Sequence, residues 1–132
     1  MPQQRKEIVI TRNIEKSHEA IETAEENIAN NRLFAALNRI YYAIFYIVTA
    51  LAKKNDFVTS KHAKLMGWFN KKFVYEDKIF DPEMLEIYKM AFAHRQDSDY
   101  DVMYTPDLEK TTELLSDVKK FIGEVEKFIQ KG

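Results

Sequence analysis

The stretch LFAALNRIYYAIFYIVTALA, residues 33–52, decides the fold of this chain. It carries one charged residue, Arg39, and two further polar residues, Asn38 and Thr49, besides its three tyrosines. A surface helix has one apolar stripe and a polar back, whereas this helix would be apolar on nearly all sides. Its length would span a bilayer, but Arg39, the tyrosines and the charged flanks argue against that. We therefore predict a central helix that is buried by neighbouring helices, alone or together with a second subunit.

Composition narrows the class of protein. At 132 residues, with 45% hydrophobic and 13% aromatic residues, the chain predicts one folded domain over residues 1–132 rather than a disordered segment. Its 20 basic and 21 acidic residues nearly cancel, so contact with nucleic acid would need a local patch. The chain has no cysteine, and no apolar segment of signal-peptide length stands at its start. We therefore expect a cytoplasmic protein without disulfides and without contact to a membrane.

Apolar spacing predicts helices on both sides of the central stretch. With only three glycines and three prolines, the chain has too few turn residues for an all-β protein. Short connections between helices make neighbours antiparallel. We predict an all-α fold, an up-and-down antiparallel bundle of about five helices. The expected helices are residues 6–29, residues 33–54, a short helix capped by Thr59 or Ser60, a helix beginning at Asp81-Pro82 that buries Leu85, Tyr88 and Ala91 or Phe92, and a regular helix from about residue 108 to 129.

Arg39 is the exception in the central helix. It lies one turn before Tyr42 and two turns before Tyr46, so the three side chains share a face. An unpaired buried charge is costly, and Arg39 must therefore be paired or face a cleft. Guanidinium groups suit phosphates and carboxylates, and tyrosines offer stacking faces and hydroxyls.

A second arginine ends the apolar stripe of the fourth helix. Arg95 stands where the next apolar residue would come, and Asp99 and Tyr100 follow about one turn later. Two interpretations remain open from the residues alone. The arginines line a polar cleft for a phosphate or a nucleic-acid backbone, or they form structural pairs with Asp97 or Asp99 that tyrosine hydroxyls complete.

The histidines give weaker signals. We expect His18 on the inner edge of the first helix, as a core histidine, whereas Lys61-His62 at the start of the third helix could reach an anion or lie at the surface. Glu15 and His18 have the spacing used in di-iron bundles, but such sites need a second pair and two further glutamates. We therefore expect no metal and no cofactor.

Four segments together resemble HEPN domains, small helical bundles named for higher eukaryotes and prokaryotes nucleotide-binding. Their shared pattern is R-x-x-Y-A-x-F on the second helix and R-x-x-x-D-Y at the end of the fourth, typical of a stand-alone prokaryotic branch of the family. The likeness covers about residues 10 to 130. The segments are NRIYYAIF (38–45), SKH (60–62), FNKKFV (69–74) and RQDSDY (95–100).

The resemblance implies a bundle that usually dimerises. Many members are encoded beside a minimal nucleotidyltransferase and form toxin–antitoxin pairs with it. Active members are metal-independent ribonucleases, whose signature is an arginine followed after four to six residues by a histidine at the dimer cleft. Arg95 matches that arginine, but Tyr100, Asp101 and Val102 occupy the positions of the histidine. Whether the chain is an enzyme therefore stays open.

Three hypotheses follow from the sequence. The first is a homodimeric HEPN module that binds RNA or a nucleotide and acts with a minimal nucleotidyltransferase. The second is a metal-independent toxin ribonuclease, and the third is a purely structural helical bundle. In the ribonuclease, Arg95 would hold the phosphate while Asp99, Tyr100 or His62 moves protons. The cleft would consist of Arg39, Tyr42, Arg95, Asp99 and Tyr100, with Tyr46 and His62 as further binding residues.

Overall fold

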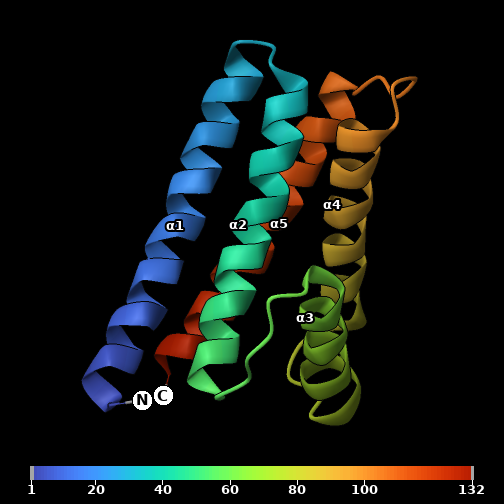
Figure 1. The fold of residues 1–132 in the computed structure, drawn as a ribbon. Coiled ribbons are helices and arrows are strands. Elements are labelled where there is room, and N and C mark those ends of the chain that lie inside the picture. Colours follow the sequence, from blue (N-terminus) through green and yellow to red (C-terminus); the bar gives the residue numbers. More distant parts are fainter. Residues whose placement is uncertain (1, 132) are drawn as a thin grey trace.

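The computed structural model describes residues 2–131 and shows the predicted all-α bundle (Figure 1). The long helices run up and down, and no strand occurs within residues 2–131. The helical segments are α1 (Gln3–Ala29), α2 (Leu33–Lys54), α3 (His62–Phe69), the π-helical segment η1 (Asn70–Glu76), α4 (Pro82–Tyr100) and α5 (Leu108–Gln130).

Helix α2 is the centre of the bundle, as predicted. It packs against α1, α5, α4 and α3 and contributes eleven buried residues. Among the described residues it is the one helix whose length and hydropathy would allow it to cross a membrane, and half of its 18-residue apolar window is buried inside the protein. A core helix has the same composition as a membrane span, and the contacts of α2 account for its apolar character.

Small residues bring α1 and α2 close together. Ala36, Ala43 and Ala50 repeat every seven residues on α2 and are fully buried. Opposite them, the buried Ser17 of α1 donates its hydroxyl hydrogen to the carbonyl oxygen of Ala43 over 2.7 Å. A short turn at Asn30-Asn31 joins the two helices, and Asn31 adopts the left-handed backbone region with φ 57°. Asparagine tolerates that region better than most residues do, which explains why the predicted break falls there.

Aromatic rings form the core of the bundle around α3. Phe69 at the end of α3 is fully buried and packs against Phe73, Phe80, Tyr88 and Phe121, with ring centroids 5.4 to 6.3 Å apart. These partners come from η1, the following loop, α4 and α5. Phe69 therefore joins the short third helix to the two last helices.

Several helix boundaries differ from the sequence prediction. Helix α1 begins three residues earlier than predicted, at Gln3. The prediction that Thr59 or Ser60 caps α3 is wrong, because Lys61 holds the N-cap position and no side chain caps it. The hydroxyl oxygen of Thr59 instead accepts a hydrogen bond from the backbone N–H of Lys61 over 3.2 Å. Threonine often forms such local turns, and here the turn competes with the cap.

Helix α4 begins at Pro82, as predicted, with Asp81 at its N-cap. The buried positions are Met84, Tyr88 and Ala91, whereas Leu85 and Phe92 are half-buried. The prediction of a buried Leu85 was therefore wrong by one residue, since Met84 takes the buried position. Charged residues interrupt the apolar positions of α4 at both ends of the helix. The sequence therefore predicts which face of α4 is buried less clearly than it does for α5.

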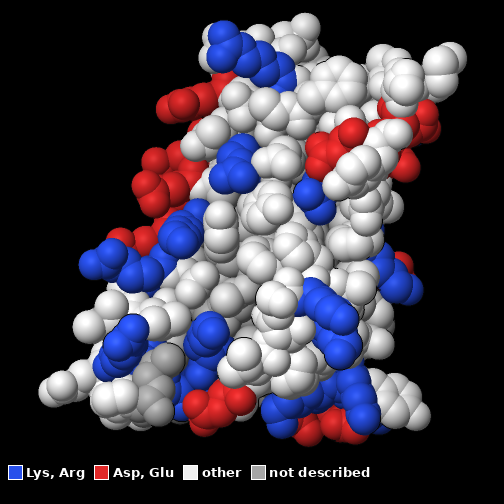
Figure 2. All heavy atoms as spheres, in the orientation of Figure 1, with Lys and Arg blue, Asp and Glu red and all other residues white. Residues whose placement is uncertain are grey.

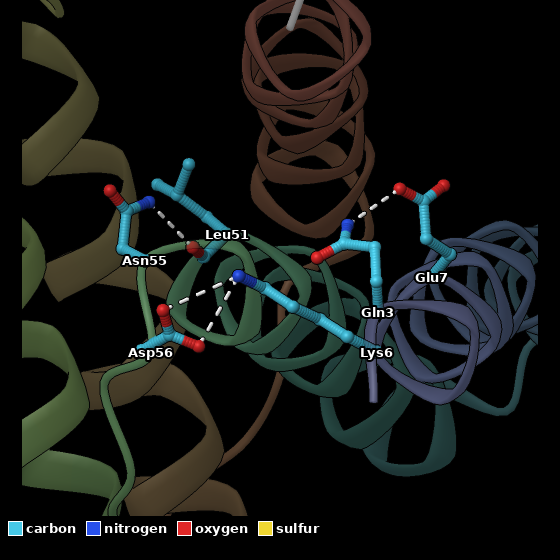
Figure 3. A network of polar contacts seen from close by, with 6 residues as sticks. All are labelled: Gln3, Lys6, Glu7, Leu51, Asn55 and Asp56. Atoms are coloured by element: carbon cyan, nitrogen blue, oxygen red, sulfur yellow. Dashed lines mark hydrogen bonds and ion pairs between the residues drawn. The ribbon is translucent and has the colours of Figure 1, made fainter. Parts of the chain in front are cut away.

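Polar contacts tie the start of α1 and the end of α5 to the end of α2. Lys6 reaches across to Asp56, with Nζ and Oδ1 3.2 Å apart, and Figure 3 shows this ion pair beside the end of α2. From the other side, the Lys54 ammonium group donates to the carbonyl oxygen of Ile129. These contacts hold α1 and α5 in register with α2. They lie at the end of the bundle that carries both chain termini, opposite the loop between α4 and α5 (Figure 1).

Candidate functional site

Helices α2, α3 and α4 bring two arginines onto the same tyrosine ring. The Cζ atom of Arg39 lies 5.1 Å from the ring centroid of Tyr42, and that of Arg95 lies 5.4 Å from it. Arg95 lies equally close, 5.4 Å, to the ring of Tyr41. A guanidinium over an aromatic face is stabilised by about 0.5–2 kcal/mol, more as it loses water. We call the group of Arg39, Tyr41, Tyr42, His62, Arg95 and Asp99 the arginine–tyrosine cluster.

The two arginines differ in their polar partners. Arg39 donates from Nε and Nη2 to the side-chain oxygen of Asn38, over 3.2 and 3.0 Å. Arg95 forms an ion pair within its own helix, with Nε 2.9 Å from Oδ2 of Asp99. The Nε–H of Arg95 does not point at that oxygen, so the contact is an ion pair without an aligned hydrogen bond.

The guanidinium of Arg95 makes no aligned hydrogen bond to the protein within residues 2–131. Its Nε–H is buried without a hydrogen-bond acceptor, and the side chain is only 16% exposed. A guanidinium held on two rings without an aligned hydrogen bond to the protein is suited to a bidentate contact with a phosphate or a carboxylate.

His62 is fixed by the tyrosine next to it. The hydroxyl of Tyr41 lies 2.7 Å from Nδ1 of His62, and the imidazole stacks on Phe45 with ring centroids 4.3 Å apart. Burial raises the pKa of Tyr41 far above its ordinary value, although the charge of Arg95 opposes this. The phenol therefore keeps its proton, and its O–H can donate a hydrogen bond to Nδ1 when the ring proton of His62 lies on Nε2.

The direction of that hydrogen bond and the tautomer of His62 depend on each other. Burial, and secondarily the charge of Arg95, lower the pKa of His62, so its imidazole is neutral near pH 7. With Nδ1 accepting from Tyr41, the ring proton lies on Nε2. Nε2 has no protein partner within residues 2–131 and is not enclosed, so it presents one more hydrogen-bond donor to solvent.

The sequence-predicted residues fall into two groups. Arg39, Tyr42, His62, Arg95 and Asp99 come together in the cluster, and Tyr46 adjoins it through Tyr42, with ring centroids 5.9 Å apart. Tyr100 does not join them. Its side chain is 74% exposed at the end of α4.

Tyr41 is the functional candidate that sequence reasoning missed. It directly precedes Tyr42, and adjacent residues of a helix point about 100° apart, so the two tyrosines cannot share one face. The signal was present, because Leu37, Tyr41, Ile44 and Val48 follow helical spacing and are all buried. Tyr41 is thus a core residue whose hydroxyl reaches His62.

The prediction of a core histidine at position 18 is wrong. The His18 side chain is 53% exposed and lies 2.6 Å, Nε2 to Oε1, from Glu126 of α5. The inward position belongs to its neighbour Ser17, which is fully buried against Ala43. His94 lies apart from the cluster, where its Nδ1 is 2.8 Å from the hydroxyl of Tyr104. Within residues 2–131 no group of three or more His, Asp or Glu side chains is arranged to hold a metal ion.

Comparison with known proteins gives a consistent result. Residues 10–128 match the sequence model of the HEPN domain. A "UPF0332 protein" of Thermotoga maritima is 32% identical over 115 residues, which cover 87% of this chain and 86% of that protein. A protein of Methanocaldococcus jannaschii named "Putative toxin MJ0142" is 32% identical over 117 residues, which cover 88% of this chain and 78% of that protein.

Proposed function

Because this chain belongs to the HEPN family, we propose that it is a homodimeric, toxin-like HEPN module that binds RNA or a nucleotide through the arginine–tyrosine cluster. We further propose that it acts with a minimal nucleotidyltransferase as its protein partner. The toxin name of the relative in Methanocaldococcus jannaschii supports a toxin–antitoxin role. Co-expression and co-purification with a nucleotidyltransferase encoded beside it would test the partner.

The observation that carries the binding proposal is the pair of guanidinium groups on Tyr42, with no aligned hydrogen bond from Arg95 to any other residue among 2–131. A phosphate placed between Arg39 and Arg95 would receive charge-assisted hydrogen bonds from both. Half-exposed rings of Tyr42 and Tyr46 lie alongside, and aromatic faces stack bases without regard to sequence. Guanidinium groups that bind phosphate, next to aromatic rings that stack on bases, favour a single-stranded nucleic acid over other phosphate compounds.

The surface around the cluster supports a dimer. Figure 2 shows few charged side chains over α2 between α1 and α4. Large apolar side chains are exposed at the same end of the bundle, on the first turn of α2 and in the loop after α4, namely Phe34, Val102 and Met103. A second copy that covers this face would bury them. Sedimentation equilibrium would show twice the chain mass if the dimer forms.

Replacing Arg39 by alanine is expected to weaken the binding of a labelled oligouridine several-fold. The loss of one phosphate contact should also reduce the slope of log K against log salt concentration by about 0.7. The free energy of unfolding should fall by about 1 kcal/mol or less, because the hydrogen bonds of Arg39 go only to its neighbour Asn38 and its contact with the Tyr42 ring is half-exposed. Fluorescence anisotropy at several salt concentrations measures both quantities.

The matched control is Arg12→Ala, which removes an exposed arginine from α1. If Arg12→Ala and Arg39→Ala lowered the affinity and the slope equally, RNA would be bound by overall charge and the cluster would not be its site.

Affinity for oligouridine is expected to rise as the pH falls through the pKa of His62, which lies below its ordinary value of 6.5. Protonated His62 would add a third positive charge to the cluster. The added affinity is therefore present below that pKa and is lost as the pH rises through it. Anisotropy titrations between about pH 5 and 7.5 test this, because His62 is the only cluster group expected to titrate there.

In His62→Gln the pH-dependent part of the affinity should disappear. His18→Gln is the matched control, since it removes an exposed histidine that pairs with Glu126 far from Arg95. A pH dependence that survives in His62→Gln and vanishes in His18→Gln would contradict the assignment.

A metal-independent ribonuclease is the second candidate, and the contact of both Arg95 and His62 with Tyr41 favours it. Arg95 would hold the scissile phosphate, and the Nε2–H of His62 would be the nearest imidazole proton. Cleavage of RNA in EDTA that is lost in Arg95→Ala would establish this activity. Intact RNA at high protein concentration would leave binding as the function.

The structural alternative has less support. A purely structural arginine closes a buried network, but Arg39 is half-buried and its hydrogen bonds go only to the adjacent Asn38. The buried Nε–H of Arg95 likewise has no aligned acceptor, so it does not belong to a completed network.

A further inference from the structure

A second surface lies at the other end of α4, about 20 Å from Arg95 along the helix axis. Two adjoining hollows of about 1070 and 330 Å³ share the residues Ile79, Phe80 and Asp81 as their common wall. The first is bounded by η1 and α4, and the second by α4 and α5. We call the two together the α4-start groove.

The floor of the groove is apolar and fixed in place. The backbone N–H groups of Ile79 and Phe80 both donate to the carbonyl oxygen of Phe73, over 2.8 and 3.1 Å, which pins the loop to η1. Tyr75 remains 76% exposed and Ile79 41% exposed. Exposed apolar groups beside a hollow are typical of a docking surface. The apolar lining includes Val74, Tyr75, Ile79, Met84, Leu85 and Ile87.

The rim of the groove is acidic. Six carboxylates and two lysines line the two hollows, which gives a local charge of −4, whereas the whole chain carries −1. The rest of the chain therefore carries +3. Of the six acids, only Glu86 has an ion pair within residues 2–131, a 4.0 Å contact with Lys89. The acids are Glu76, Asp81, Glu83, Glu86, Asp117 and Glu124, and the lysines are Lys78 and Lys120.

We propose that the α4-start groove binds a basic amphipathic helix of another protein. The apolar face of that helix would cover Tyr75 and Ile79, and its lysines and arginines would meet the unpaired carboxylates of the rim. Helix-in-groove recognition uses this combination of apolar anchors and a charged rim, and complementary charge speeds the encounter and selects the partner. The negative rim repels RNA. The groove therefore differs from the arginine–tyrosine cluster in its position on the fold and in the sign of its charge.

The test uses a fluorescent Leu/Lys peptide of about five helical turns with its leucines on one face, and a scrambled peptide of the same composition. Anisotropy should show the amphipathic peptide binding at least about tenfold more tightly than the scrambled one. The double variant Glu76→Lys/Glu86→Lys should weaken binding by about tenfold or more, whereas Glu19→Lys/Glu22→Lys, on exposed positions of α1, should change it less than about twofold.

A second variant tests the floor without changing any charge. Tyr75→Ser/Ile79→Ser should also weaken peptide binding, and circular dichroism would confirm that each variant is folded. Equal binding of the two peptides, or equal losses in the groove and α1 variants, would overturn the proposal. Self-association that Glu76→Lys/Glu86→Lys abolishes, without peptide binding, would assign the groove to a second copy of this chain and would also overturn it.

Discussion

Arg95→Ala is expected to weaken the binding of single-stranded RNA by about 10- to 100-fold, the largest effect of any single substitution in the arginine–tyrosine cluster. Hydrogen bonds to a charged group are worth about 1.5–3 kcal/mol, and about 1.4 kcal/mol corresponds to a factor of ten. Arg95 has the larger effect because it lies over both Tyr41 and Tyr42, beside His62, and makes no aligned hydrogen bond within the described part of the chain. Anisotropy with oligouridine at about 0.1 M salt measures the change.

The variant Arg95→Lys separates the contribution of the positive charge from that of the planar guanidinium group. Lysine keeps the positive charge but lacks the planar fork, so a site built for a bidentate contact should recover only part of the affinity. The free energy of unfolding of Arg95→Ala should fall by about 1–2 kcal/mol, from the lost contacts with the tyrosine rings and the partly exposed ion pair with Asp99. RNA binding that is unchanged in Arg95→Ala would remove the basis of the proposed function.

Phe69→Ala is expected to lower the free energy of unfolding by about 3–5 kcal/mol, as deletion of a large buried ring does elsewhere. Phe69 is fully buried, and its loss would leave a cavity between α3, α4 and α5. Urea denaturation followed by circular dichroism measures the change. Met90→Ala is the control, because that large apolar side chain of α4 is about half exposed and its loss should cost less than about 1 kcal/mol. Equal midpoints for the two variants would show that the aromatic core is not the stabilising centre described above.

The fold was predictable because the apolar pattern left few alternatives. Residues 33–52 are apolar on nearly all sides, and only a central position in a bundle covers such a helix. The alternation by three and four in α5 fixed its buried face at Val118, Ile122 and Val125. The cap of α3 was not predictable in the same way, since a threonine hydroxyl forms local turns as readily as helix caps.

The cluster was predictable only in part. Arg39 and Arg95 stood out because charges interrupt apolar stripes, and Asp99 follows Arg95 by one helical turn, a spacing that permits the ion pair within one helix. The role of Tyr41 depended on the position of His62, which comes from a different helix, and helix spacing does not reveal contacts between helices. Tyr100 was expected beside Arg95 from a linear motif, but at the end of α4 its side chain turns outward.

The seven-residue repeat of Ala36, Ala43 and Ala50 has a consequence for how α2 is set in the bundle. The isoleucines of α1, at positions 14, 21 and 28, follow the same period. A strict period of seven drifts by about 20° per repeat on a straight α-helix, so two such helices stay in contact only by supercoiling in a left-handed sense. The pair α1 and α2 thus has the seven-residue sequence pattern of a short antiparallel coiled coil. The direction in which α2 presents Arg39 and Tyr46 is therefore set in part by the alanines three and four residues away from them, which face α1.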